Sequence, residues 1–102
     1  MFNEEALKNL GVSSFDAADY LETDEDCARF LQAAIDDGDA NVLVKALDVV
    51  SRAHGVTDLV RKTGLSRSGI YGALSGEKKP EFETVYKILK ALNMKLSISA
   101  NS

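Results

Sequence analysis

The sequence has little of the two residues on which many metal and nucleophile sites depend. Cys27 is its one cysteine and His54 its one histidine, in a chain of 102 residues. A single cysteine excludes an intrachain disulfide and a multi-cysteine metal site, and agrees with a reducing cytoplasm. Cys27 falls on the apolar face of an expected helix, which favours an inert buried thiol. His54 stands at an expected helix end without a second catalytic residue nearby, so a capping or surface role is expected.

Long apolar runs and phosphate-binding loops are also missing. No apolar run approaches the roughly 18 residues of a membrane span. The first ten residues, MFNEEALKNL, lack the basic and then apolar pattern of a signal peptide. Gly69 and Gly72 lie inside an expected helix and not in a loop that opens from a strand. These absences favour a cytoplasmic protein that is not an enzyme, and neither a cofactor nor a metal is expected.

What the sequence does contain is an uneven distribution of charge. The whole chain carries a net charge of −4. Residues 1–41 have eleven acids and two bases, a balance of −9, whereas residues 42–102 have five acids and ten bases, a balance of +5. This asymmetry suggests that the two ends face different partners, one of which is polyanionic. The alternative is an acidic solvated surface that keeps a small protein soluble.

Apolar spacing predicts an all-α fold in one domain, residues 1–102, because 45% of the residues are hydrophobic and a second domain of normal size does not fit. An acidic helical segment is expected at 1–38, a helix-turn-helix core at 39–93 and a strand at 94–99. A short turn of helix is expected from Ser14 to about Leu21. Five longer helices are expected, after the caps Thr23, Asp39, Thr57 and Ser66 and from Glu81 to Leu92.

The apolar residues at helical spacing form the expected core. They are Cys27, Phe30, Leu31, Ala34, Ile35, Val42, Leu43, Ala46, Leu47, Val50, Ala53, Leu59, Val60, Thr63, Ile70, Leu74, Phe82, Val85, Ile88, Leu89 and Leu92. Asn93 is expected as a left-handed helix end.

The last segment alternates apolar and polar residues, which is typical of a half-buried strand. Met94, Leu96 and Ile98 are its apolar positions, and no second strand candidate of comparable quality exists in the chain. A lone strand leaves its hydrogen-bonding edges unpaired, so pairing with its copy in a second subunit, or with a strand of another protein, is expected. Met94, Leu96 and Ile98 are therefore candidate dimerisation residues.

Residues 56–80 have the pattern of a helix-turn-helix. Gly64 suits the sharp bend, and Ile70 and Leu74 suit the packing of the second helix. The outer face of that helix is polar and fits a major groove of DNA. Its candidate contacts, with those of the flanking segments, are Thr57, Arg67, Ser68, Tyr71, Gly72, Ser75, Lys78 and Lys79.

Each candidate type has a chemical role at DNA. Arg67 can donate two hydrogen bonds to guanine, Ser68 can reach a base edge or a phosphate, and Tyr71 can contact a thymine methyl or a phosphate. Lys78 and Lys79 suit phosphates, with Arg52, Arg61 and Lys62 as weaker candidates.

Two stretches carry a resemblance to a known family. Gly64–Ser97 reads GLSRSGIYGALSGEKKPEFETVYKILKALNMKLS, and Phe15–Ala40 reads FDAADYLETDEDCARFLQAAIDDGDA. Both resemble HigA-like addiction-module antidote proteins, members of the phage-repressor-type (lambda-repressor-like) helix-turn-helix superfamily. The resemblance covers about Phe15 to Ser99, nearly the whole chain.

The resemblance implies a dimeric antitoxin that neutralises a RelE/HigB-like toxin, a small basic ribonuclease, and represses its own operon by binding double-stranded DNA. It places Arg67, Ser68 and Tyr71 where the family reads its operator. Asp58 would repel a phosphate, and Gly72 has no side chain with which to read a base, so modest affinity for DNA is expected. A stand-alone transcriptional regulator without a toxin partner is the alternative.

The acidic half is expected to bind the toxin, because a ribonuclease presents a basic surface to RNA. The candidate toxin-binding residues are Asp24, Glu25, Asp26, Asp36 and Asp37. The alternative for each of them is a local role at a helix end.

Overall fold

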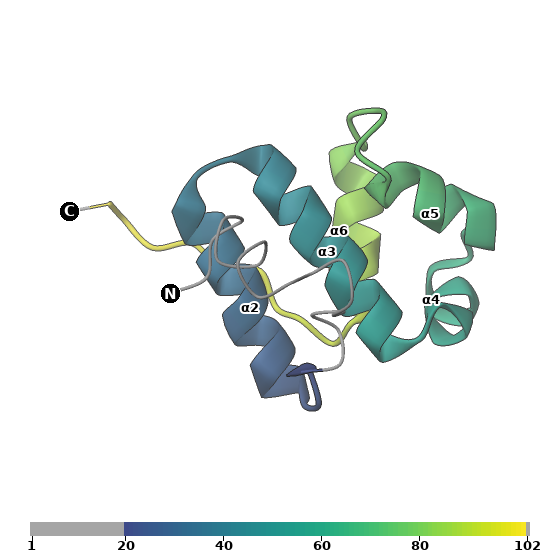
Figure 1. Ribbon diagram of the computed structural model, residues 1–102, viewed down its shortest axis with the longest axis horizontal. Helices are drawn as coiled ribbons and strands as arrows, with labels where there is room; N and C mark the ends of the chain where they lie inside the picture. The colour runs from purple at the N-terminus through teal and green to yellow at the C-terminus, as the bar shows by residue number, and fades with distance from the viewer. Residues whose placement is uncertain (1–19, 102) are drawn as a thin grey trace.

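A computed structural model describes residues 20–101, and this range contains five helices and no strand. With the labels of Figure 1, they are α2 (Asp24–Asp37), α3 (Ala40–His54), α4 (Val56–Thr63), α5 (Arg67–Leu74) and α6 (Phe82–Ala91). None of these helices has the length and apolar character needed to cross a membrane. The predicted all-helical fold is confirmed for the described residues, whereas the helical turn predicted from Ser14 lies mostly outside them.

Side chains cap three of the helices as the sequence predicts. The Thr23 hydroxyl accepts from the Asp26 backbone N–H at 3.0 Å, and the Asp26 carboxylate accepts from the Thr23 N–H at 3.2 Å, which together form a capping box. Asp39 caps α3 by accepting from the Asn41 N–H, and Ser66 caps α5 by accepting from the Gly69 N–H, each at 2.9 Å. These contacts satisfy backbone donors that a helix start leaves without partners.

The predicted cap of α4 is wrong. Thr57 is the second residue of α4, and Gly55 occupies the cap position with a φ of 106°. This backbone conformation is open to glycine and lets the chain pass from α3 into α4 across a single residue. Val56 consequently begins the helix and is itself buried.

Helix α3 lies at the centre of the molecule. It packs against α2, α4 and α5, and Figure 1 shows α2 running antiparallel beside it. The buried apolar residues of all five helices form one cluster: Cys27, Leu31, Ala34, Val42, Ala46, Leu47, Val50, Val56, Leu59, Ile70, Leu74, Ile88, Leu89, Ala91 and Leu92. Most of the predicted core is therefore confirmed.

Two residues predicted for the core face solvent. Ile35 is 44% exposed and Phe82 is 70% exposed. Phe82 is the first residue of α6 and its ring stacks on that of Tyr86, with centroids 6.1 Å apart. The buried residues of α6, Ile88, Leu89 and Ala91, lie in its second half. Val85 in the first half packs against the core while only partly buried, and Phe82 at the start of the helix lies outside it.

The C-terminal segment has no strand in the described chain. Asn93 takes the left-handed conformation predicted for it, with a φ of 66°, and the Met94 N–H then donates to the Leu89 carbonyl oxygen at 3.0 Å. Met94 packs against the core. Residues 94–101 carry no strand because a ladder needs a neighbouring strand, and the described residues contain none.

The turn between α4 and α5 predicts a stability effect at Gly64. Its φ of 75° is costly for any other residue, so Gly64→Ala should lower the free energy of unfolding by about 1–2 kcal/mol. Urea unfolding followed by circular dichroism measures the change. Gly72→Ala is the matched control, because Gly72 lies inside α5 with open space around it, and alanine there should add about 1 kcal/mol. Equal effects of the two changes would contradict the assigned backbone conformations.

Candidate nucleic-acid interface

A three-residue connection, Gly64–Ser66, joins α4 to α5. The Gly64 N–H donates to the Val60 carbonyl oxygen at 3.1 Å and ends α4. The Thr63 hydroxyl donates to the Leu59 carbonyl oxygen at 2.6 Å and accepts from the Leu65 N–H at 3.1 Å, which ties the connection to α4. These bonds hold the start of α5 in place.

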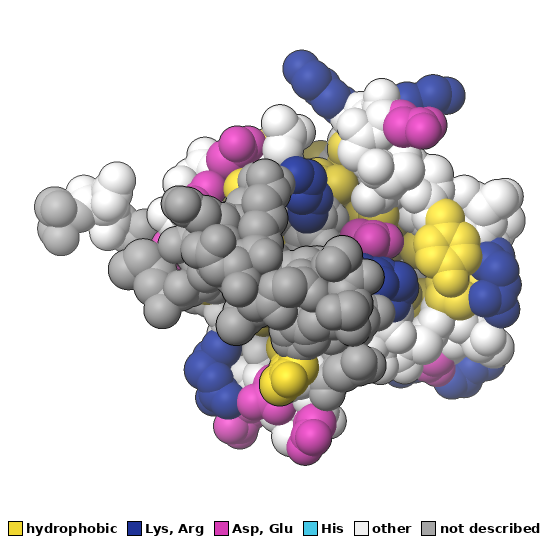
Figure 2. All heavy atoms as spheres, in the orientation of Figure 1, with side chains coloured by type: hydrophobic (Ala, Val, Ile, Leu, Met, Phe, Trp, Pro, Cys, Tyr) yellow, Lys and Arg dark blue, Asp and Glu magenta, His cyan; other side chains and the backbone are white. Residues whose placement is uncertain are grey.

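The inner face of α5 is buried and its outer face is open. Ile70 and Leu74 are 0% and 3% exposed, as predicted. The residues predicted to contact DNA on this helix and the turn after it are all exposed: Arg67, Ser68, Tyr71, Gly72, Ser75, Lys78 and Lys79. Figure 2 shows Lys and Arg side chains projecting over the turn that follows α5 and beside the outer edge of α5. The structure therefore leaves every predicted contact on α5 and the turn after it accessible to a ligand.

Thr57 and Arg67 meet across the two helices. The Arg67 guanidinium donates to the Thr57 hydroxyl at 3.0 Å, which links the first turn of α4 to the first residue of α5. Both side chains are exposed. The hydroxyl limits the directions that the long arginine side chain can take, and the remaining guanidinium N–H groups stay available to a ligand.

The serines in and beside α5 form hydrogen bonds within the chain that the sequence does not predict. Ser66 caps the helix, and its hydroxyl lies 3.3 Å from that of Ser68. The helix ends at Leu74, so Ser75 lies just beyond it. The Ser75 hydroxyl donates to the Gly72 carbonyl oxygen at 3.0 Å and accepts from the Glu77 N–H at 3.2 Å. Ser75 thus stabilises the end of α5.

The two glycines inside α5 differ in their surroundings. A Cβ on Gly69 would lie 3.0 Å from the hydroxyl oxygen of Ser66, so glycine leaves room for the cap. A Cβ on Gly72 would meet nothing within 4 Å. Packing within the chain therefore accounts for Gly69 and leaves Gly72, which is exposed on the outer face, without an intramolecular reason.

Asp58, predicted to repel phosphate, pairs with two basic side chains and a histidine. The His54 Nε2 atom donates to its carboxylate at 2.7 Å, the Lys62 Nζ atom lies 3.1 Å away, and Arg61 also pairs with it. The hydrogen bond from His54, followed by that from Lys62, holds the pKa of Asp58 far below its ordinary value. The negative charge of Asp58 is therefore largely neutralised, and Arg61 and Lys62 form the ion pairs that neutralise it.

The predicted acidic residues all lie at the two ends of α2. Asp26 belongs to the capping box and pairs with Arg29 at 2.7 Å, and its hydrogen bond from the Thr23 backbone lowers its pKa. Asp24 accepts from the Asn93 amide at 3.0 Å, and Asp36 accepts from the Gln32 amide at 3.0 Å. Glu25 and Asp37 are exposed. Helix capping and local pairing thus use some of these acids without removing them from the surface.

Cys27 and the predicted dimerisation residues have different environments. Cys27 is a free, buried thiol whose pKa is raised by burial and by the nearby Asp24, in agreement with an inert role. Met94 is engaged in the core, whereas Leu96 is 44% exposed and Ile98 95% exposed. Only Leu96 and Ile98 are therefore available on the surface of the chain.

Sequence reasoning missed three features of the structure. The first is the exposed stack of Phe82 on Tyr86, and the sequence predicts Phe82 for the core. The Lys90 ammonium lies 5.5 Å from the centre of the Tyr86 ring. The His54–Asp58–Lys62 pairing follows an i, i+4 spacing that could have indicated it. The Thr57–Arg67 contact spans ten residues and has no comparable signal in the sequence.

Comparison with known proteins defines the class of this small helical protein. A family model described as a probable addiction module antidote protein matches residues 11–100. A Haemophilus influenzae (strain Rd) protein, described as an uncharacterized protein, is 33% identical over 87 residues, which cover 85% of this chain and 90% of that relative. No solved structure matches the chain. The chain belongs to the family of probable addiction module antidote proteins, and membership implies a toxin as its partner.

The contacts of Asp58 predict a pH-dependent contribution to stability. Because its pKa is lowered in the folded state, the carboxylate contributes stability above its unfolded pKa near 4 and loses it as the pH falls toward the folded value. Asp58→Asn should therefore lower the urea midpoint at pH 7, and the difference from the natural chain should shrink below about pH 4. Asp48→Asn, which removes a longer 3.4 Å pair with Arg52, is the control and should have a smaller effect. A deficit that is the same at both pH values would contradict the assignment.

Proposed function

We propose that this protein is the antitoxin of a type II toxin-antitoxin module. It binds and neutralises a basic, RelE/HigB-like ribonuclease toxin, and as a homodimer it represses its own operon by sequence-specific binding to double-stranded DNA. The observation that carries the toxin half is the match of residues 11–100 to the antidote family. The DNA half is supported by the exposed outer face of α5 and the separation of charge along the chain.

In this proposal α5 enters the major groove of the operator. Arg67 donates to the O6 and N7 atoms of a guanine, and Thr57 holds its guanidinium in the required direction. Ser68 and Tyr71 contact neighbouring base edges or phosphates. Gly72 allows the helix backbone to approach the DNA closely, which gives a reason for a mid-helix glycine that the packing of the chain does not require.

Phosphate contacts come from the turn after α5. Lys78 and Lys79 are exposed in this turn, directly after the helix proposed to enter the groove, and their ammonium groups suit phosphate oxygens. The pairing of Asp58 with His54, Arg61 and Lys62 reduces its repulsion of a phosphate. It also removes Arg61 and Lys62 from the set of free phosphate ligands, so the lysines of the turn carry most of the non-specific attraction.

Operator binding by a dimer requires two copies of α5. Two half-sites roughly 34 Å apart would match one turn of DNA. Residues 95–101 are the candidate contact, because their backbone has no strand partner in the described chain and Ile98 is almost fully exposed. Leu96 and Ile98 are proposed to contact the second copy of the chain.

Co-expression with the adjacent reading frame tests the toxin half. That frame is expected to encode a basic protein of about 100 residues that arrests growth when expressed alone, and growth should return when this chain is co-expressed. The two proteins should also elute together in size exclusion. An operator-binding chain with no such neighbour, or a neighbour whose toxicity it does not relieve, would instead favour a stand-alone regulator.

Substitutions on α5 and the following turn test the DNA half. Arg67→Ala should remove the preference for operator over random DNA, a loss of about 1–3 kcal/mol, while Lys78→Ala/Lys79→Ala should weaken binding to all sequences. Gly72→Ala, which the fold accommodates, should weaken operator binding without unfolding. Fluorescence anisotropy at several salt concentrations measures all three.

The salt dependence supplies the control for these variants. Contact with about four to eight phosphates per dimer predicts a log-log slope near −4 to −7. The slope should be shallower for Lys78→Ala/Lys79→Ala than for Arg67→Ala. Affinity that does not depend on salt would rule out DNA binding through this surface.

A further inference from the structure

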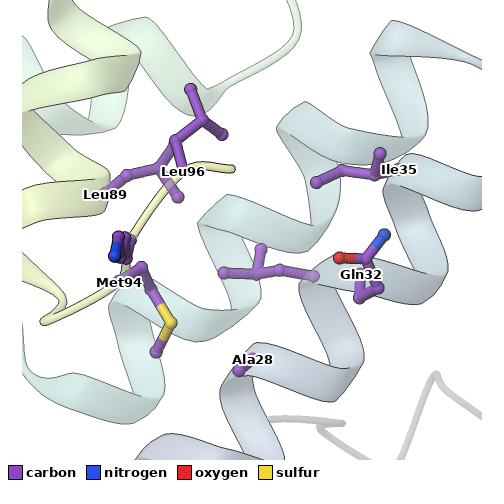
Figure 3. Close-up of a pocket in the computed structure, with 8 residues that line it drawn as sticks. Ala28, Gln32, Ile35, Leu89, Met94 and Leu96 are labelled. Carbon is purple, nitrogen blue, oxygen red and sulfur yellow. The ribbon is translucent and has the colours of Figure 1, made fainter. Parts of the chain in front are cut away.

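Helix α2 and the C-terminal segment enclose a groove of about 100 Å³. In Figure 3, Ala28, Gln32 and Ile35 of α2 lie on one side of it and Met94 and Leu96 of the C-terminal segment on the other. Apart from Gln32 and Lys95, the side chains that line it are apolar. The groove lies on a different part of the chain from α4, α5 and the turn proposed to bind DNA.

The groove leaves apolar side chains open to solvent. Ile35 and Leu96 both line it, and each is 44% exposed. Ile35 is one of the two predicted core residues that are exposed. Two half-exposed aliphatic side chains that share one depression form a continuous apolar patch, and such patches mark contact sites more often than scattered single residues do.

Acidic side chains stand at both ends of this apolar row. Residues three and four apart on a helix are neighbours, so Asp24 and Glu25 lie one turn before Ala28, and Asp36 lies one turn after Gln32. The hydrogen bond from Gln32 to Asp36 at 3.0 Å places that carboxylate beside the lining. The bond from Asn93 to Asp24 places the other end beside the C-terminal segment. Figure 2 likewise shows acids gathered at the two ends of α2.

Charge distinguishes the possible occupants. Residues 1–19 carry four acids and one base, so that segment has the same sign as the rim of the groove. A second copy placed on this face about a two-fold axis would bring its own acidic rim against the first. A basic partner has the complementary sign at both ends, and only Lys95 among the lining residues opposes it.

We propose that this groove is the docking site of the basic toxin. An apolar side chain of the toxin enters between Ile35 and Leu96, and its lysines and arginines meet Asp24 and Glu25 at one end of α2 and Asp36 and Asp37 at the other. This assignment rests on the toxin-neutralising function proposed above and names the surface that performs it. It also leaves α5 uncovered, so one chain can hold toxin and DNA together.

The test measures the affinity of the full chain for the purified product of the adjacent reading frame. Ile35→Ser and, separately, Leu96→Ser should each weaken binding about 10- to 100-fold, the effect of losing about 1.5–3 kcal/mol of apolar burial. Phe82→Ser is the matched control, because Phe82 is an exposed apolar residue of α6 that does not line the groove, and affinity should not change. Thermal melts establish that each variant folds, and sedimentation establishes that Ile35→Ser keeps its oligomeric state. Because Leu96 is also a candidate dimer contact, the affinity of Leu96→Ser is compared per chain.

The charged rim is tested separately from the apolar row. Glu25→Gln/Asp36→Asn/Asp37→Asn should lower the association rate and flatten its dependence on salt, while Glu83→Gln on α6 should not. These acids lie on α2 and do not line the groove, so the substitutions change the charge of its rim and leave its apolar lining as it is.

The outcomes separate this surface from the general function. Loss of toxin affinity in the groove variants, with Phe82→Ser unchanged, supports the docking site. Toxin binding that survives Ile35→Ser and Leu96→Ser overturns the docking site but not the antitoxin function. A change from dimer to monomer in both groove variants, with the affinity per chain unchanged, would assign the groove to a second copy and also overturn it. If the natural chain does not bind the product of the adjacent frame, the proposed function itself fails.

Discussion

Burial of α3 is the constraint on which the other helices depend. Ala46, Leu47 and Val50 are at most 1% exposed, and α2, α4 and α5 all pack against this helix. Isolated helices of the length of α4 or α5, eight residues each, are not stable in water. They persist because α3 packs against both of them, α6 packs against α4, and the two pack against each other. One central helix therefore supports both the acidic surface of α2 and the polar face of α5.

This arrangement keeps two surfaces of opposite character apart. The acids of residues 1–41 that the structure describes lie on α2 or close to its ends, whereas Arg67, Lys78 and Lys79 belong to α5 and the turn after it. A protein that binds a basic toxin and polyanionic DNA needs such a separation, because an acid near the DNA would repel phosphates. Asp58 lies on α4, beside the surface proposed to face DNA, and Arg61 and Lys62 pair with its carboxylate while His54 donates a hydrogen bond to it.

Helix positions and the inner face of α5 were predictable because they depend on local chemistry. Thr23, Asp39 and Ser66 cap through their own side chains, and apolar spacing marks the buried faces. Thr57 was misassigned because the sequence does not report that Gly55 adopts a φ of 106° and starts α4 two residues earlier than a cap at Thr57 would. Phe82 was misassigned because periodicity shows which face of α6 is apolar and not how far other helices cover it.

The sequence by itself determined the helical fold, the division of charge between the two halves and the residue types on the outer face of α5, since these follow from composition and spacing along the chain. The tertiary structure alone decided the contacts between distant residues. Thr57 meets Arg67 ten residues away, Asn93 meets Asp24 across 69 residues, and the C-terminal segment forms a groove with α2 in place of a strand. Such contacts depend on how the helices pack around α3, and no local pattern encodes that packing.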